Sequence, residues 1–192
     1  GSGNNNHTGQ GTVANAGQYE VNGLGGKGVV VFGTNDTLEM DPAVTGVKTV
    51  FAVFKQTGDA SAAGKMLGGD LVTTSVAEKV GLQRDGGSGM IDSGVSSLSY
   101  NVVTFQMDAG AYSLFVNGSD KGSGTDAQAI GGLDRLGNGI PSKIAEIVGY
   151  DRILPTLARQ KIEGYLAHKW ALDSQLSAEH PHKIVLPAFG GN

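Results

Sequence analysis

The sequence contains no cysteine, which excludes disulfide frameworks, thiolate metal sites and cysteine nucleophiles. It also lacks any apolar run close to the roughly 18 to 20 residues that span a bilayer, so a membrane-embedded protein is excluded. Aromatic residues make up only 6% of the chain and charged residues only 17%. The formal net charge of −4 is not the basic excess of a phosphate-backbone binder, so we expect no nucleic-acid partner.

Glycine fills much of the space that charged and aromatic residues leave, with 32 glycines among 192 residues. These glycines have no three-residue period, which excludes a collagen helix. The length suits a single domain with one sizeable core. We take residues 1–21, which begin with Gly1-Ser2-Gly3, as a tag remnant and an N-terminal arm or outer strand. Residues 22–192 are expected to form one domain.

Short apolar runs separated by Gly, Asn, Asp and Ser predict many strands. The run from Val47 to Lys55 is almost continuously apolar, which predicts a strand covered on both faces. The segments 100–108 and 111–116 each alternate apolar and polar residues, as in an antiparallel hairpin. Asn117-Gly118 is a strong turn signal, so another strand should follow it. The segment 142–151 predicts a last strand.

The hydrophobic pattern changes near the C-terminus from alternation to helical spacing. Pro155 presets the backbone angle of a first helical turn. The apolar residues that recur at helical spacing after it are Ala158, Ile162, Tyr165, Leu166 and Trp170. We therefore predict one amphipathic helix near residues 155–171. Many short strands followed by one late helix indicate an all-β sandwich or jelly roll.

Three segments in the last third of the chain form a specific pattern. Residues 142–152 read SKIAEIVGYDR, residues 153–172 end in EGYLAHKWAL, and His180-Pro181 follows. This pattern resembles the bacterial LamG-like jelly-roll domains of the concanavalin A-like lectin and glucanase superfamily. The TVFAVF segment at residues 49–54 is similar to another strand of that family. The chain departs from the family at Ala171, where the family usually has glycine.

The resemblance implies a two-sheet antiparallel jelly-roll sandwich with the C-terminal helix packed outside. Domains of this kind occur as modules of large secreted or cell-surface bacterial proteins, including adhesins. The implied partner is a glycan or a cell-surface protein, and the implied location is extracellular or on the bacterial surface. We expect no membrane insertion and a monomeric module within a larger chain. Fold does not fix function here, because the superfamily holds both lectins and glycanases.

A structural calcium ion is also implied by the resemblance. Calcium prefers hard oxygen ligands, which loops with Asp and Asn beside Gly supply. In related calcium-binding sandwiches the ligands come from two loops at one sheet edge, and those loops hold Asp59, Asp134 and Asn138 in this sequence. With Asp85 added, these residues are also our candidate ligand contacts. The alternative is that they serve their own backbone in turns.

The catalytic carboxylates of the family's glucanases are not reproduced. Those enzymes place the pair on one strand as Glu-x-Asp-x-x-Glu, and hydrolysis needs carboxylates about 5 to 10 Å apart. Glu39-x-Asp41 begins the pattern, but Val44 takes the last position and Pro42 is expected to interrupt the strand. Glu146 has no carboxylate two residues away. We therefore expect no enzyme.

Four other residues have both a functional and a structural interpretation. Trp170 is a sugar-stacking platform in one interpretation and a core residue in the other. His180-x-His182 is either a metal chelate or a packed pair in the tail. The resemblance makes His168 a packing or hydrogen-bonding residue. For all four, the pattern favours structure.

The sequence thus predicts a non-catalytic, lectin-like binding module. The alternative is a structural spacer or protein-interaction module without a small ligand. A glycanase or lyase whose carboxylates come from different strands is the third hypothesis, because spacing along the chain cannot exclude it. Binding is expected at strand-connecting loops at a rim of the sandwich or on the concave sheet. Loops are favoured because their backbone groups are free and a rigid sandwich holds them.

Overall fold

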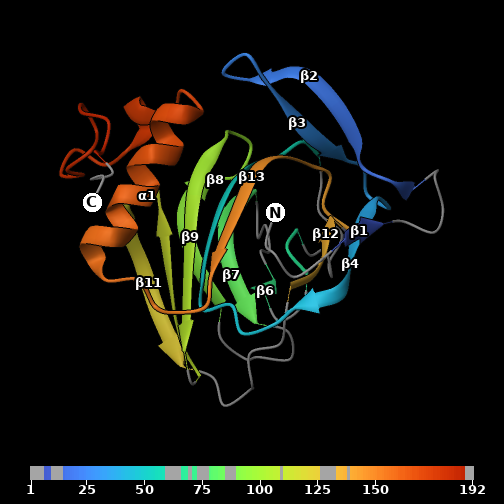
Figure 1. Cartoon of the computed structure of the whole chain (residues 1–192), viewed down its shortest axis with the longest axis horizontal. Helices are drawn as coiled ribbons and strands as arrows, with labels where there is room; N and C mark the ends of the chain where they lie inside the picture. Colours follow the sequence, from blue (N-terminus) through green and yellow to red (C-terminus); the bar gives the residue numbers. More distant parts are fainter. Residues whose placement is uncertain are drawn as a thin grey trace.

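The computed structural model describes residues 7–9, 15–58, 66–68, 71–72, 78–84, 90–108, 110–125, 133–137 and 139–188. Its strands form two facing layers, and helix α1 covers the outer side of one of them (Figure 1). The expected antiparallel β-sandwich with an outer helix near the C-terminus is confirmed. Within the described part, no helix is both long and apolar enough to cross a bilayer.

The larger layer is a seven-stranded sheet in the order β11-β10-β9-β5-β13-β3-β2, as far as the described residues show. Its strands are β2 (Gln18–Leu24), β3 (Lys27–Phe32), β5 (Thr49–Gln56), β9 (Asn101–Asp108), β10 (Ala111–Val116), β11 (Ser119–Thr125) and β13 (Ser142–Tyr150). The expected boundary at residue 21 falls inside β2. Strand β5 is buried on both faces, as its continuous apolar run predicts.

The opposing layer consists of two short sheets. One has the order β1-β4-β12 and the other β6-β7-β8. Their strands are β1 (His7–Gly9), β4 (Thr37–Val44), β12 (Leu133–Gly137), β6 (Leu71–Val72), β7 (Lys79–Arg84) and β8 (Met90–Ser96). The expectation that Pro42 interrupts a strand is wrong, because β4 continues through it.

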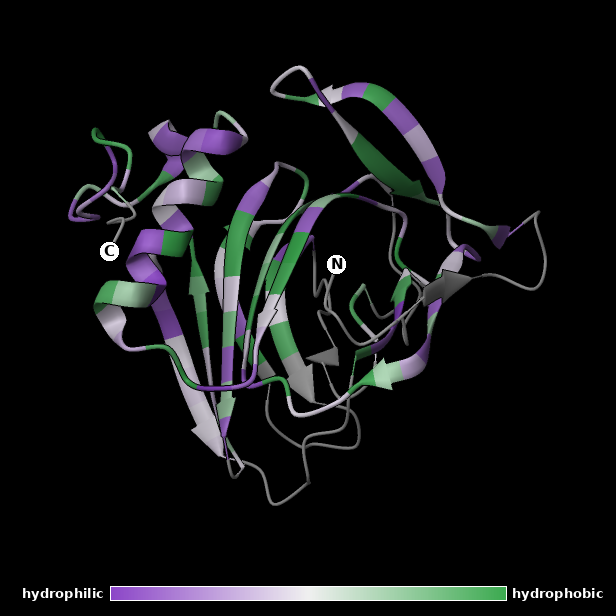
Figure 2. Ribbon diagram, viewed as in Figure 1, coloured by the Kyte–Doolittle hydropathy of each residue, from purple (hydrophilic) through white to green (hydrophobic). Residues whose placement is uncertain are grey.

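The sandwich interior follows from alternation along the central strands. In β9 the inward residues are Val103, Phe105 and Met107, all of them buried. They face the same core as the inward residues of β10, which are Tyr112, Leu114 and Val116. Hydrophobic segments alternate with hydrophilic ones along the strands of the large sheet (Figure 2). Burying each such side chain stabilises the fold by about 1.5 to 3 kcal/mol.

The outer face of the large sheet is buried by the helix. Phe51 and Val53 of β5 point to this side and pack in one cluster with Leu166, Ala167 and Trp170. The helix therefore covers apolar surface that would otherwise face water. This second core explains why the central strands are apolar at consecutive positions and not only at alternate ones.

Helix α1 (Thr156–Lys169) starts directly after Pro155, close to its predicted position. The apolar periodicity locates the helix correctly, but it misassigns part of the buried face. Tyr165, expected in the core, has 36% of its surface exposed. The buried face includes instead Arg159 and Glu163, two charged residues.

The end of the helix depends on a left-handed residue. Ala171 has a φ of 57°, and the N–H of Leu172 donates to the carbonyl of Ala167 at 2.7 Å, which closes the last turn. A short 3₁₀ helix, η2 (Asp173–Gln175), follows. A left-handed backbone strains alanine but not glycine, so alanine at this position carries an energetic penalty.

We expect Ala171→Gly to stabilise the protein by roughly 1 kcal/mol. The substitution relieves the left-handed strain of the folded state. Part of this gain is offset, because glycine loses more conformational entropy than alanine when the chain folds. For a chain of this size, the melting temperature should rise by about 2 to 4 °C. Thermal unfolding followed by circular dichroism measures this. A lower melting temperature would show that the methyl group of Ala171 contributes more packing than strain.

The predicted turn after β10 is confirmed. Asn117 and Gly118 have φ values of 51° and 77° and connect β10 to β11. The Asn117 side chain donates to Oδ1 of Asn101 at 2.8 Å and accepts from the N–H of Val102 at 2.9 Å. The turn therefore ties the hairpin to the start of β9.

Candidate ligand-binding site

Only one of the four predicted site residues can be placed. Asp59, Asp85 and Asn138 lie outside the described residues. Asp134 lies in β12, and its Oδ2 accepts from the guanidinium of Arg135 at 3.0 Å, while Oδ1 lies 3.3 Å from Arg135 Nε. This hydrogen bonding, together with the Asp134 charge, raises the pKa of Arg135 above its usual value.

The pairing of Asp134 argues against its use as a calcium ligand. Both carboxylate oxygens point at a cation that the chain itself supplies, so calcium would have to displace Arg135. Among the described residues, no group of three His, Asp or Glu side chains is arranged to hold a metal ion. The other two expected calcium ligands, Asp59 and Asn138, lie outside the described residues, so the calcium site stays a prediction.

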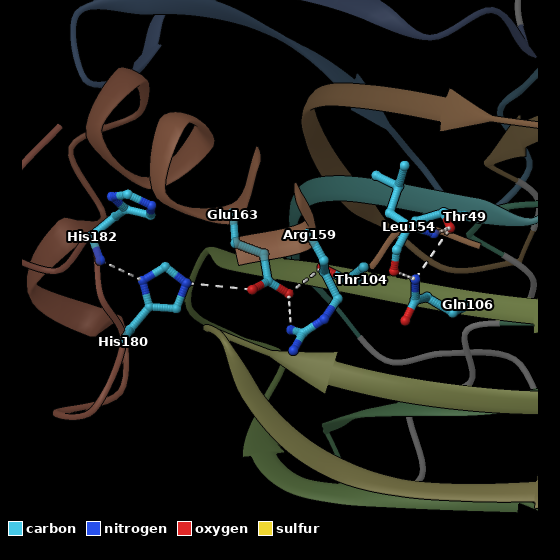
Figure 3. A network of polar contacts seen from close by, with 8 residues as sticks. All are labelled: Thr49, Thr104, Gln106, Leu154, Arg159, Glu163, His180 and His182. Atoms are coloured by element: carbon cyan, nitrogen blue, oxygen red, sulfur yellow. Dashed lines mark hydrogen bonds and ion pairs between the residues drawn. The ribbon is translucent and has the colours of Figure 1, made fainter. Parts of the chain in front are cut away.

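A buried polar cluster forms under helix α1 (Figure 3). Glu163 is completely buried, and its Oε1 accepts from Thr104 Oγ1 at 2.8 Å and from Arg159 Nη1 at 2.7 Å. The Arg159 guanidinium also lies over the ring of Phe115, 3.7 Å from its centroid. We call Thr104, Arg159, Glu163 and His180 the Glu163 cluster.

His180 completes the cluster from the C-terminal tail. Its Nδ1 accepts from the backbone N–H of His182 at 3.3 Å, so in this tautomer Nε2 carries the hydrogen that points at Glu163 Oε2, 3.4 Å away. His180 stacks closely on Gly118, where a Cβ would come within 2.3 Å of the imidazole. An acid beside a histidine suggests catalysis, but both side chains are fully buried. The Glu163 cluster therefore fastens the tail to the helix and the sheet.

His168 of α1 and His182 of the tail have the structural roles that the sequence favoured. His168 Nε2 donates to the carbonyl of His182 at 2.9 Å. Burial, and next the charge of His180, lower the pKa of His182, which favours the neutral imidazole. Gly164 leaves room for this packing, because a Cβ there would lie 2.4 Å from Cβ of His182.

Glu146 and Trp170 form a second link between the helix and the sheet. Glu146 Oε2 accepts from Trp170 Nε1 at 2.6 Å, and Oε1 accepts from Lys169 Nζ at 2.8 Å. Trp170 is buried in the outer core, as expected, and so offers no face to a sugar. Glu146 is a hydrogen-bonded strand residue with its charge matched by Lys169.

A hollow of about 550 Å³ opens at one end of the sandwich and is our candidate site. Its apolar walls come from both layers. They are Met40 and Val44 of β4, Leu133 and Leu136 of β12, and Ile147 of β13. Its volume lies within the range of pockets that bind small molecules, about 300 to 1,000 Å³. We call this feature the rim hollow.

The mouth of the rim hollow lies at two chain reversals. The link from β4 to β5 contributes Thr45, Gly46 and Val47, and Gly46 takes a φ of 73° to make the bend. The end of β13 contributes Gly149, Tyr150 and Asp151. Asp151 is the one charged residue in the described lining, and its side chain is 84% exposed beside Arg152.

Sequence reasoning did not find the rim hollow. Its walls are apolar strand residues, which have the same pattern as any residue of a filled core. The signal that was present is a pair of glycines. Gly46 and Gly149 stand where strands end at the mouth, and Gly149 lies against Val47 with only 3.3 Å available for a Cβ.

The carboxylates that begin the glucanase pattern face away from this hollow. Glu39 and Asp41 are exposed on β4, whereas Met40 between them lines the hollow. Glu39 lies opposite Arg135 in the register of β4 and β12. These two carboxylates thus belong to an outer surface that carries its own counter-charge.

No protein-family model matches this chain, and neither does any curated protein sequence. Solved structures do share its fold. Domain 4 of an extracellular arabinanase from Geobacillus stearothermophilus, solved in complex with arabinotriose, matches with a TM-score of 0.53 and 12% identity. That match covers 74% of this chain and 78% of the arabinanase domain.

Two toxin domains match over more of the chain. The binding domain of Paraclostridial Mosquitocidal Protein 1 has a TM-score of 0.60 at 12% identity, over 85% of this chain and 48% of that one. The receptor-binding domain of botulinum neurotoxin type G has a TM-score of 0.56 at 12% identity, over 84% and 47%. This chain thus spans about half the length of each toxin domain. At these identities the likeness shows a shared β-sandwich fold.

Proposed function

We propose that this chain is a non-catalytic ligand-binding module of an extracellular bacterial protein, and that its ligand is a glycan or a cell-surface protein. The observation that carries the proposal is the rim hollow, which is concave, mostly apolar and framed by chain reversals at one end of a rigid sandwich. The known ligands of matched folds support it. One matched domain was solved with arabinotriose. Another matched structure is that of botulinum neurotoxin type C, whose cell entry depends on interaction with two ganglioside molecules.

The non-catalytic part of the proposal rests on the conspicuous acids. Glu146 is bonded to Lys169 and Trp170, and Glu163 to Arg159 and Thr104. A general acid or base needs contact with substrate and a proton to exchange. Both carboxylates instead link the helix to the sheet.

Membership of the LamG-like domains and an adhesin as the parent protein are part of the same proposal. The motif that resembles this family covers Glu146, Glu163, Trp170 and His180, and all four connect the helix or the tail to the large sheet. Such a motif preserves a way of attaching a helix to a sandwich. The motif therefore supports the proposed family fold, but it does not determine the ligand, which depends on other residues.

We propose that this binding does not depend on calcium, since Asp134, the one expected calcium ligand that can be placed, is paired with Arg135. We expect the protein to bind its ligand on glycan or surface-protein arrays equally well in calcium and in EDTA, and to release no reducing sugar from polysaccharides. Calcium should leave the melting temperature unchanged. If calcium did bind, a concentration of a hundred times its Kd would raise the free energy of unfolding by about 2.7 kcal/mol. The melting temperature would then rise by roughly 5 to 10 °C.

Three outcomes would contradict the proposal. Release of reducing sugar would make the protein an enzyme. Binding lost in EDTA, or a melting temperature that rises with calcium but not with magnesium, would restore the calcium site; Asp134→Ala is then the variant that locates it. Absence of binding on both arrays by folded protein would favour a structural spacer.

A further inference from the structure

Within the part of the chain that the structure describes, strand β13 beside the rim hollow has a free edge over its second half. β13 pairs with β5 from Ser142 to Tyr150. On its other side, β3 pairs with β13 only from Ser142 to Ile144. The hairpin of β2 and β3 then leans away from β13 toward the end of helix α1 (Figure 1). Among the described residues, the second half of β13 has no strand on this side.

The free edge presents its backbone groups beside the rim hollow. The carbonyl of Tyr150 accepts from the N–H of Lys48, so Tyr150 directs its backbone groups toward β5. Backbone groups alternate in direction along a strand, and Gly149 and Ile147 therefore direct theirs toward the free edge. Both residues line the rim hollow. Donors, acceptors and an apolar recess thus meet at one place.

This combination specifies the ligand chemistry. A sugar ring would bring hydroxyl groups against the walls of Met40, Val44 and Leu136, which offer them no polar side chain. An acyl chain would suit the walls but leave the strand edge without partners. An extended polypeptide satisfies both, because its backbone pairs with β13 while alternate side chains enter the hollow.

Charge narrows the choice further. The acidic side chain in the described lining, Asp151, is matched by a base of the chain itself, Arg152, at 3.5 Å. The described walls hold no charge that could compensate one on a buried guest. The side chains that enter the hollow must therefore be uncharged and apolar.

We propose that the free edge of β13 at Ile147–Gly149 binds an extended apolar segment of a partner protein as an added strand, with its side chains in the rim hollow. This inference rests on the proposed function and selects a protein ligand within it. It also assigns the contact to one strand edge.

The test uses a fluorescent nine-residue peptide of alternating threonine and leucine with a lysine at each end. Binding is measured by anisotropy. Two matched peptides carry backbone N-methyl groups, either on the residues whose N–H faces β13 or on the alternate residues that face away. We expect only the first set to weaken binding, by at least about tenfold, because only these peptides lose hydrogen bonds to the backbone of β13.

Two protein variants locate the site. Val44→Phe places bulk in the rim hollow and should weaken peptide binding by at least about tenfold, which corresponds to 1.4 kcal/mol. Val21→Phe adds the same bulk on β2, where Val21 is 68% exposed, and should bind as the unmodified protein does. If Val44→Phe does not fold, hydrogen exchange decides instead. In the unmodified protein, the backbone amides of Ile147 and Gly149 should exchange fast without the peptide and slowly with the peptide bound.

Three results would overturn the inference: equal binding of both methylated peptides, full binding by folded Val44→Phe, or exchange at Ile147 and Gly149 that the peptide leaves unchanged. A glycan-array signal without peptide binding would remove this inference and leave the proposed function standing. Absence of both the glycan-array signal and peptide binding would contradict both this inference and the proposed function.

Discussion

Glu163→Ala is expected to destabilise the protein by about 3 to 5 kcal/mol, the largest effect of any single polar substitution proposed in this molecule. The substitution leaves Arg159 buried without its anion, and removing one partner of a buried ion pair has this magnitude. It also removes the acceptor of Thr104 and the partner of His180. Urea unfolding gives the free energy, and the melting temperature should fall by roughly 6 to 20 °C.

Two controls separate this effect from a general loss of charge. Asp151→Ala breaks an exposed ion pair with Arg152 and should change stability by less than about 1 kcal/mol. The double variant Arg159→Met with Glu163→Leu removes both charges and should be more stable than Glu163→Ala. A double variant as unstable as the single one would mean that packing, and not the unpaired charge, dominates.

Loss of Glu163 is also expected to affect the C-terminal tail. His180 is held between Glu163 and Gly118, and the N–H of Ser177 donates to the carbonyl of Asn117 at 2.9 Å. Loss of Glu163 should therefore loosen residues 177–188 before the sandwich unfolds. Limited proteolysis of Glu163→Ala at a temperature where circular dichroism still shows native strands checks this order of events.

The strands were predictable because their signals are local. The alternation in residues 100–108 and 111–116, and the turn at Asn117-Gly118, each specify a backbone state within a few residues. The continuous apolar run of β5 correctly indicated a strand with two covered faces. What covers the second face, the helix from 156 to 169, was implied by a resemblance and not by the strand itself.

The buried charges were not predictable from periodicity. A helix of this sandwich is expected to bury an apolar stripe, yet Arg159 and Glu163 are buried while Tyr165 is 36% exposed. The reason is non-local. Thr104 on β9, 59 residues away in sequence, provides the hydrogen bond that makes a buried carboxylate tolerable.

The candidate site was harder to predict for a related reason. Asp134 was chosen because Asp residues in loops suit calcium, but it lies in a strand, and its immediate neighbour Arg135 takes its oxygens. A sequence shows which groups are available and not which neighbour occupies them. The rim hollow was invisible because a hollow is a space between residues such as Met40 and Ile147 that both look like core.

Gly137→Ala is expected to destabilise the protein by about 2 to 5 kcal/mol. Gly137 ends β12 with a φ of 77°, where alanine is strained by about 1 to 2 kcal/mol. A Cβ there would also lie 2.5 Å from the backbone carbonyl oxygen of Asp36 and from the buried ring of Phe32. Neither neighbour can turn aside freely, since one is backbone and the other is fully packed, so overpacking adds about 1 to 3 kcal/mol.

The matched control is Gly26→Ala in the turn between β2 and β3. Gly26 has a φ of 73°, nearly that of Gly137, but nothing lies within 4 Å of its ideal Cβ. This variant should therefore lose only the strain of the backbone, about 1 to 2 kcal/mol. The difference between the two free energies of unfolding measures the contact of Gly137 with Asp36 and Phe32. Equal losses would mean that these neighbours give way, and that the junction between β3, β4 and β12 is looser than its packing indicates.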